Sequence, residues 1–212
     1  MSQIFIDNGL EYLLFSVGKR GFTPDPLHLN DIQPVNFDGK FWKKGDVFLS
    51  LRHQSMVLLY RPLTNKIIWK GVGPYFHQHD VDILNDNKIS VFNNNSKGFF
   101  SGEVVDGNNE VIIYDFNTNQ YSKYLNESLI KNSVRTNTRG RSEILPNGDL
   151  FIEETNFGRI LYFDASGDLR WTFFNRANNN RTYGLDWGRI LYKNIDIQIV
   201  NKFLQSRVKC DV

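Results

Sequence analysis

Two histidines stand at the starts of consecutive repeats in this sequence, and their side chains could do chemistry. His28 opens residues 28–31 (His-Leu-Asn-Asp), and His79 lies about fifty residues later in residues 78–80 (Gln-His-Asp). Imidazole can act as a nucleophile, an acid or a base near neutral pH. If the repeats bring these segments together, the sequence describes a reactive site as well as a fold. The competing interpretation is that each histidine only caps a strand and bonds to the backbone.

Arginines near equivalent points of the sequence favour an anion as the ligand. The corresponding strand starts further along the chain are residues 139–142 and 186–189, and both contain arginine. Guanidinium offers a planar fork of donors that matches sulfate, phosphate or carboxylate. Arg52 ends another strand and would reach the same end of the fold only if that strand folds back. His53 and His77 flank these motifs, and we expect them to point away because side chains alternate along a strand.

A metal site is the alternative chemistry for the same segments. His28, Asp31, His79 and Asp80 are all permissible ligands for a divalent ion. The chain lacks the tight spacing of a His-Glu-x-x-His motif, so the sequence favours an anion site without a metal or another cofactor. The adjacent carboxylates at 153–154 are expected to face opposite ways on a strand, in contact with solvent or an arginine.

Recurring turns and strands must position these residues. Gly- or Asn-bearing turns precede the apolar runs at 47–51, 89–92 and 150–153, and a second strand follows each of them. Trp69 and Trp171 each end a later strand, where we expect them to pack within the array. This pattern is typical of an all-β fold, a β-propeller of four-stranded antiparallel blades. We expect one domain over 1–212, with blades at 27–72, 77–126 and 139–175 and partial blades at 1–20 and 183–212.

The partial blades raise the question of how the ring closes. We expect Tyr12–Ser16 to be the last strand of one blade and Tyr183–Leu191 to begin another, with Ile195–Val208 as the only helix. Open strand edges invite pairing with another chain, so a homodimer through these edges is possible. A chain shortened at its N-terminus is the favoured explanation, and combination of the two ends into a fourth blade is the alternative.

Composition narrows the class of protein. With 212 residues, 41% of them hydrophobic and 14% aromatic, the chain can bury one good core. The net charge of +2 gives no reason to expect a nucleic acid or a membrane surface as partner. The single cysteine, Cys210, excludes an internal disulfide and a thiolate metal cluster. The start of the chain shows no signal peptide and no apolar run long enough to span a membrane, and the cellular location stays unknown.

The ordered motifs resemble the arylsulfotransferase family. That family's pattern is His-x-Asn, Ser-x-Arg-x-Gln, a Trp that ends a strand, Gln-His, and then Phe-Asp-Asn. This sequence has the same order, with motifs that begin at His28, Ser50, Trp69, Gln78 and Phe92. The match is specific across 27–95, and the later blades are similar to the family's bacterial branch. Asn93 replaces the aspartate of the last motif.

The resemblance implies a six-bladed propeller and an enzyme that uses no nucleotide donor or other cofactor. It implies transfer of a sulfuryl group from an aryl sulfate to a phenolic acceptor through a covalent histidine intermediate, with His79 as the nucleophile. His28, Asn30 and Arg52 would bind the sulfate oxygens. Many members are exported. The competing function is a catalytically inactive β-propeller that serves as a binding or scaffold module, and a metal-dependent hydrolase is a third possibility.

Overall fold

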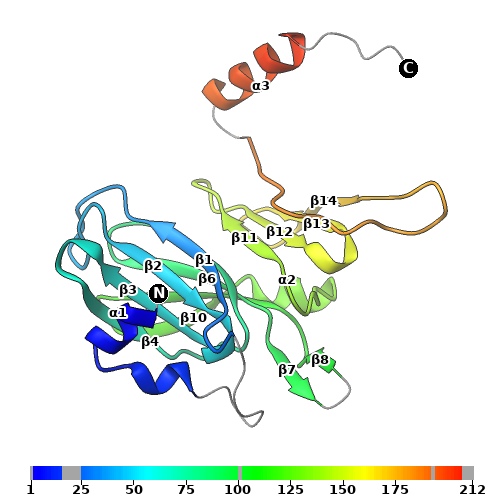
Figure 1. Cartoon of the computed structure of the whole chain (residues 1–212). Coiled ribbons are helices and arrows are strands. Elements are labelled where there is room, and N and C mark those ends of the chain that lie inside the picture. The colour runs from blue at the N-terminus through cyan, green and yellow to red at the C-terminus, as the bar shows by residue number, and fades with distance from the viewer. Residues whose placement is uncertain (1, 16–24, 100–101, 192–193, 207–212) are drawn as a thin grey trace.

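The computed structural model describes residues 2–15, 25–99, 102–191 and 194–206, and most of the strands in these residues form three antiparallel sheets of four strands each (Figure 1). The first sheet has the order β1-β2-β3-β4. Its strands are β1 (Leu29–Pro34), β2 (Val47–Leu51), β3 (Met56–Arg61) and β4 (Lys66–Gly71). It lies within the predicted blade 27–72.

The second sheet has the order β10-β9-β6-β5 and carries an insertion. Its strands are β5 (His79–Ile83), β6 (Lys88–Asn93), β9 (Glu110–Asp115) and β10 (Gln120–Tyr124). Between β6 and β9 the chain makes a two-stranded hairpin, β7 (Ser96–Phe99) and β8 (Gly102–Val105), which projects from the sheets in Figure 1. This hairpin explains why the second repeat is longer than a plain four-stranded unit.

The third sheet has the order β11-β12-β13-β14. Its strands are β11 (Arg141–Ile144), β12 (Leu150–Glu154), β13 (Arg159–Phe163) and β14 (Leu169–Phe174). Three successive four-stranded antiparallel sheets confirm the predicted all-β propeller class. The sheets lie within the predicted ranges 77–126 and 139–175, and the number of blades in a complete ring stays a prediction.

Similar tight turns join the second and third strands of the first and third sheets. In each, a short 3₁₀ turn follows the second strand and ends at a residue in the left-handed region, Ser55 at φ 47° and Gly158 at φ 60°. Gly158 has no room for a side chain, because a Cβ would lie 1.9 Å from the carbonyl oxygen of Tyr183. The turns reverse the chain so that the hydrophobic runs pair as hairpins.

Apolar side chains fill the spaces between neighbouring sheets. Trp42, Phe48 and Leu59 from the first unit pack with Val91 and Ile112 of the second. A second cluster joins the second and third sheets, and it contains Phe92, Val111, Leu150, Ile152, Leu161 and Phe163. Burial of this apolar surface holds the sheets face to face. The starts of their first strands are thereby held in fixed positions relative to one another.

The N-terminal residues differ from the prediction. Tyr12–Ser16 was expected to form a strand, but Glu11–Leu14 forms a 3₁₀ helix after α1 (Ser2–Asp7), and Ser16 lies outside the described residues. Phe5 and Leu13 pack on Leu49 and Leu58, on the opposite side of the first sheet from the second. This segment therefore covers a sheet face instead of adding a strand to an edge.

The prediction of a single helix was also wrong. Besides α1, residues Asn126–Lys131 form α2, whose six residues are too few to show a periodic pattern. α3 (Asn194–Ser206) matches most of the predicted helix and stands apart from the sheets in Figure 1, whereas 207–208 lie outside the described residues. No helix in the described part of the chain is long and apolar enough to cross a membrane.

The strand predicted at Tyr183–Leu191 does not form. The backbone amides of Tyr183 and Leu185 donate to the carbonyl oxygens of Asn175 and Thr155, but no strand pairs with this segment in the described structure. Residues 183–191 instead run as an extended segment along the third sheet. Pairing of an open edge with a second chain stays a prediction.

Candidate active site

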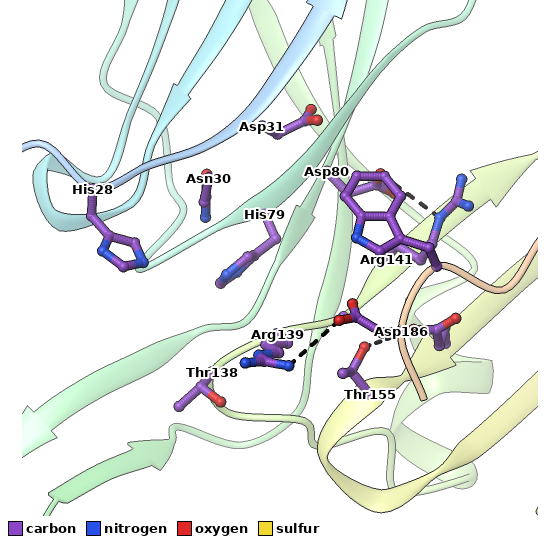
Figure 2. A pocket seen from close by; sticks show the side chains of 13 residues that line it. His28, Asn30, Asp31, His79, Asp80, Thr138, Arg139, Arg141, Thr155 and Asp186 are labelled. Carbon is purple, nitrogen blue, oxygen red and sulfur yellow. Dashed lines mark hydrogen bonds and ion pairs between the residues drawn. The ribbon is translucent and has the colours of Figure 1, made fainter. Parts of the chain in front are cut away.

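The first strands of the three sheets begin around one cavity of about 240 Å³ (Figure 2). The described residues that line it come from the starts of β1, β5 and β11, from the end of β12 and from the extended segment. They are His28, Asn30, Asp31, His79, Asp80, Thr138, Arg139, Gly140, Arg141, Glu153, Thr155, Asp186 and Trp187. The structure therefore brings His28, Asn30 and His79 together, and it adds arginines from the third sheet.

His79 is held in one orientation by a buried asparagine. Its Nδ1 lies 2.7 Å from Oδ1 of Asn94. The amide nitrogen of Asn94 donates to the carbonyl oxygens of Thr136 and Arg139 at 3.1 and 2.8 Å. These two bonds identify which end of the Asn94 amide faces the histidine, so Nδ1 of His79 carries the proton. The lone pair of the neutral ring is then on Nε2 of His79.

Burial keeps the His79 ring neutral. Burial lowers the pKa of His79 to about 4, and the positive charge of Arg52 acts in the same direction, whereas the hydrogen bond that Nδ1 donates to Asn94 raises the pKa. Burial also lowers the pKa of His77 to about 4. At neutral pH, His79 is therefore an uncharged imidazole, which is the form that can attack an electrophile.

Two β-bulges place neighbouring side chains in the same cavity. The register of β5 against β6 shifts between His79 and Val81, and the intervening Asp80 has φ 50°. A matching shift occurs in β1, where Asn30 lies between Leu29 and Asp31. A bulge interrupts the alternation of a strand, so consecutive side chains can reach one side. This is why both His79 and Asp80 line the pocket.

The bulged residues also tie one sheet to the next. Oδ2 of Asp31 accepts a hydrogen bond from the backbone amide of Val81 at 2.8 Å, and Oδ2 of Asp80 accepts one from the amide of Ser142, also at 2.8 Å. Nδ2 of Asn30 donates to the carbonyl oxygen of Gln78 at 2.7 Å. Polar side chains from one first strand thus fix the next strand at the pocket.

His28 lies at the partly exposed side of the cavity. Its backbone has φ 48°, and its Nδ1 lies 2.8 Å from a carboxylate oxygen of Asp25. The ring of His53 stacks on it with a centroid distance of 4.5 Å. His53 is in turn 6.2 Å from the ring of His77. All four histidines of the chain therefore gather at this end of the fold, although His53 and His77 do not line the cavity.

Arg52, the fourth residue predicted for the site, does not line the cavity. Its side chain is buried and forms an ion pair with Glu103 of β8, and Oε1 of Glu103 lies 3.7 Å from Nδ1 of His77. The Arg52 guanidinium nevertheless influences the site, since its charge lowers the pKa of His79. Direct contact between Arg52 and a substrate stays a prediction.

Two other arginines border the cavity. Arg139 is exposed, and one of its terminal nitrogens lies 3.6 Å from the Asp186 carboxylate (Figure 2). Arg141 is buried, donates from Nη1 to the carbonyl oxygen of Gly188 at 2.7 Å and lies 5.9 Å from the centre of the Trp187 ring. An exposed pair such as Arg139–Asp186 separates at little cost, which leaves Arg139 available to an anion.

Carboxyl groups also line the cavity, and two of them hold protons more tightly than usual. Burial raises the pKa of Asp31, and burial together with the negative charge of Asp82 raises the pKa of Asp80 well above its ordinary value. Glu153 is buried and accepts a hydrogen bond from Thr155 at 2.7 Å. Its neighbour Glu154 is also buried and pairs with Arg159. The predicted contact with an arginine is therefore found for Glu154, and the predicted contact with solvent is found for neither glutamate.

The geometry gives no support to the metal alternative. Within the described ranges, no three His, Cys, Asp or Glu side chains are grouped so that they could hold an ion. His28 and Asp31 belong to the same cavity as His79 and Asp80, but the hydrogen bonds above direct them to separate partners.

Sequence reasoning missed two residues that shape the site. Asn94 is the last residue of the motif that begins at Phe92, so the resemblance contained its signal, but no role was assigned to it. Trp187 reaches the cavity from the extended segment, with φ 65°. Residues 186–189 were expected to reach the site as the start of a strand. Asp186 and Trp187 do line the cavity, but no strand begins there.

Comparison with known proteins supports one family. A family model described as Arylsulfotransferase (ASST) matches residues 1–176. No curated protein matches the chain. Among solved structures, apo AztD from Citrobacter koseri gives a TM-score of 0.37 at 14% identity, with 66% of this chain and 34% of that one covered.

Two lyases are similar to the same limited degree. A streptogramin B lyase gives a TM-score of 0.39 at 13% identity and covers 79% of this chain. Virginiamycin B lyase from Staphylococcus aureus, in selenomethionine-substituted form, gives 0.33 at 13% identity and covers 66%. The chain covers 63% and 57% of those two structures, so it spans less than two thirds of each of the three solved structures.

Proposed function

The chain belongs to the arylsulfotransferase family, and from this premise we propose that its pocket transfers a sulfuryl group from an aryl sulfate to a phenol through a covalent intermediate on His79. One observation carries the proposal. His79 is a neutral imidazole whose Nδ1 proton is held by Asn94, in a cavity that is also lined by arginines and polar side chains.

The first half of the reaction uses the lone pair on Nε2 of His79. This nitrogen attacks the sulfur atom, a bond forms between nitrogen and sulfur, and the bond between sulfur and the aryl oxygen breaks. The hydrogen bond from Nδ1 to Asn94 stabilises the positive charge that develops on the ring. In the second half a phenol oxygen attacks the sulfur, and His79 recovers its lone pair. Two separate half-reactions predict ping-pong kinetics.

Sulfate oxygens would be held from both sides of the cavity. His28 and the amide of Asn30 approach from the first sheet, and Arg139 approaches from the third after it leaves Asp186. Arg52 contributes its positive charge from outside the cavity. A cavity of about 240 Å³ lies just below the range of roughly 300–1,000 Å³ for drug-sized ligands, which suits a single small aromatic sulfate.

Release of nitrophenol from 4-nitrophenyl sulfate, with phenol as acceptor, tests the proposal. We expect the wild type to release nitrophenol and to carry one sulfuryl group on the peptide that contains His79 when no acceptor is present. His79→Ala should lose at least about a thousandfold in rate, as expected when a nucleophile is removed. The matched control is His53→Gln, which changes a histidine outside the cavity and should keep most of the activity. Undiminished release by His79→Ala would rule out the mechanism.

A binding module without catalysis is the second candidate, and the Arg52–Glu103 ion pair favours it. Glu103 already occupies a guanidinium that the family pattern assigns to sulfate. In that case the protein would bind an aryl sulfate without releasing nitrophenol. Calorimetric titration with 4-nitrophenyl sulfate, beside the release assay, separates binding alone from transfer.

A further inference from the structure

Sulfuryl transfer from an aryl sulfate leaves a phenoxide, and the transfer to a new phenol must remove a proton. His79 cannot supply or take this proton, because its Nε2 is bonded to sulfur and its Nδ1 proton is held by Asn94. The departure of a poorly stabilised phenoxide and the attack of a phenol therefore both need a second titratable group in the cavity. The question is which side chain has a proton to give and a free atom to give it from.

Asp80 has a position that meets this need. The β-bulge at φ 50° turns its side chain into the cavity beside the nucleophile, where an ordinary strand would point it the opposite way. Its Oδ2 is fixed by the amide of Ser142 at 2.8 Å. Its Oδ1 receives no hydrogen bond from any residue that the structure describes, and it lies 3.8 Å from Nε of Arg141.

The surroundings of Asp80 favour a carboxyl group that can hold a proton and release it. Burial is the largest influence and favours the neutral form, and the carboxyls of Asp82 on β5 and Asp31 on β1 act in the same direction. Arg141 on β11 and the amide of Ser142 oppose them by stabilising the carboxylate. Two more distant charges, Glu143 and Arg189, act on Asp82 with opposite signs. The net effect raises the pKa of Asp80, which favours a protonated carboxyl group, and Arg141 and Ser142 stabilise the carboxylate that remains after the proton is released.

We propose that Asp80 is the general acid and general base of the sulfuryl-transfer site, which rests on the function proposed above. In the first half-reaction Nε2 of His79 bonds to sulfur, the bond from sulfur to the aryl oxygen breaks, and the departing oxygen takes the proton from Oδ1 of Asp80. The Asp80 carboxylate then takes the proton of the acceptor phenol while the phenol oxygen bonds to sulfur. The nitrogen–sulfur bond breaks, its electron pair returns to Nε2, and Asp80 is again protonated.

Asp80→Asn tests the assignment through the dependence on the leaving group. The amide keeps an oxygen for the Ser142 N–H but cannot transfer the proton. Nitrophenoxide leaves without help, so nitrophenol release from 4-nitrophenyl sulfate should fall less than about tenfold. Release of phenol from phenyl sulfate should fall about a hundredfold or more, the range of general acid catalysis. Transfer from the sulfuryl-enzyme to phenol should also fall, and should recover as the pH approaches about 10, where phenols ionise.

Asp31→Asn is the matched control. Asp31 lines the same cavity and bonds the backbone of the next sheet at the same 2.8 Å distance, so it shares the structural role of Asp80. We expect any loss in Asp31→Asn to be similar for both sulfates. Equal losses for both sulfates in Asp80→Asn would overturn the assignment, and so would selective loss of phenyl sulfate activity in Asp31→Asn.

The wild-type protein gives an independent test if Asp80→Asn does not fold. With a general acid present, the rate of the first half-reaction should depend only weakly on the pKa of the leaving phenol across a series of aryl sulfates. A steep dependence contradicts the role of Asp80 while nitrophenol release still supports His79. Absence of both nitrophenol release and the sulfuryl–His79 adduct would reject the proposed function, and the role of Asp80 with it.

Discussion

The outer strands of the first and third sheets carry a tryptophan each, and the two tryptophans have different surroundings. Trp69 on β4 packs between the first two sheets, where its ring lies 5.0 Å from Tyr114 and 4.9 Å from Phe116. Trp171 on β14 stacks on Tyr162 of its own sheet at 5.3 Å and is 42% exposed. All six residues of β14 are exposed.

The difference shows that the burial of an outer strand depends on the presence of a neighbouring sheet. Where the first two sheets face each other, aromatic packing, a polar network and all four histidines are concentrated. The strand sequences of the third sheet are similar, but its outer strand meets no packed layer in the described structure. Stability and chemistry should therefore respond strongly to changes at the first junction and weakly to changes on β14.

Acid should reveal this difference most clearly. The pKa of His79 is lowered from 6.5 to about 4, so the unfolded chain takes up a proton near pH 6.5 that the folded protein refuses until about pH 4. The stability that neutral His79 contributes is present above pH 6.5 and is lost as the pH falls to about 4. A shift of this size corresponds to at most about 3 kcal/mol. Relative to His79→Gln, the wild type should lose up to that amount over this interval.

Comparison with a variant is essential for this measurement, since other groups act in the opposite direction. Burial raises the pKa of Asp82 to about 6, so that group stabilises the fold at low pH and loses this contribution as the pH rises. Urea unfolding of wild type and His79→Gln at several pH values between 4 and 7 cancels this contribution. A difference that does not change with pH would contradict the burial of His79 as a neutral ring. Trp171→Ala, the control, should give a difference independent of pH.

Replacement of each tryptophan by alanine measures the packing directly. Trp69→Ala should lower the free energy of unfolding by about 2 to 3 kcal/mol, somewhat less than for a fully buried tryptophan because the side chain is only partly buried. Trp171→Ala should cost less than about 1 kcal/mol, since 42% of its surface is already in contact with water. Urea unfolding of the two variants compares them, and equal losses would show that β14 is covered in solution.

The repeat could be predicted because its physical cause is local. A turn residue before each apolar run and alternation along each strand are visible in the sequence, and they gave the three sheets and the class of fold. The hairpin β7–β8 and the N-terminal helix could not be predicted in this way. The short N-terminal helices are stabilised because Phe5 and Leu13 pack on one face of the first sheet. This contact is tertiary and is not visible in the local sequence pattern.

The site also contains residues that the repeat predicts and residues that it does not. His28, Asn30 and His79 reach one cavity because first strands converge, which the repeat indicates. Asp80 could not be placed, since strict alternation would turn it away from His79 and only the bulge brings it in. The partner of Arg52 depends on Glu103, which belongs to the inserted hairpin. Contacts made by insertions and bulges are the ones that a repeat pattern leaves out.

A pair of side-chain amides gives the smallest expected difference between the two regions. Nε2 of Gln78 is buried at the first junction and bonds Ser50 Oγ at 3.1 Å and the carbonyl oxygen of Met56 at 3.0 Å. In the third unit, Nδ2 of Asn175 bonds the carbonyl oxygen of Gly184 at 3.1 Å in an exposed position. Gln78→Met leaves buried acceptors without a donor and should cost about 1 to 2 kcal/mol.

Asn175→Leu should cost less than about 0.5 kcal/mol, because water can replace the amide at an exposed carbonyl. Both substitutions keep the approximate length or shape of the side chain, so packing contributes little to the comparison. Urea unfolding at pH 7 measures the two losses. A loss in Asn175→Leu as large as in Gln78→Met would mean that the segment after β14 is held as firmly as the first junction, and the contrast between the two regions would then apply to β14 alone.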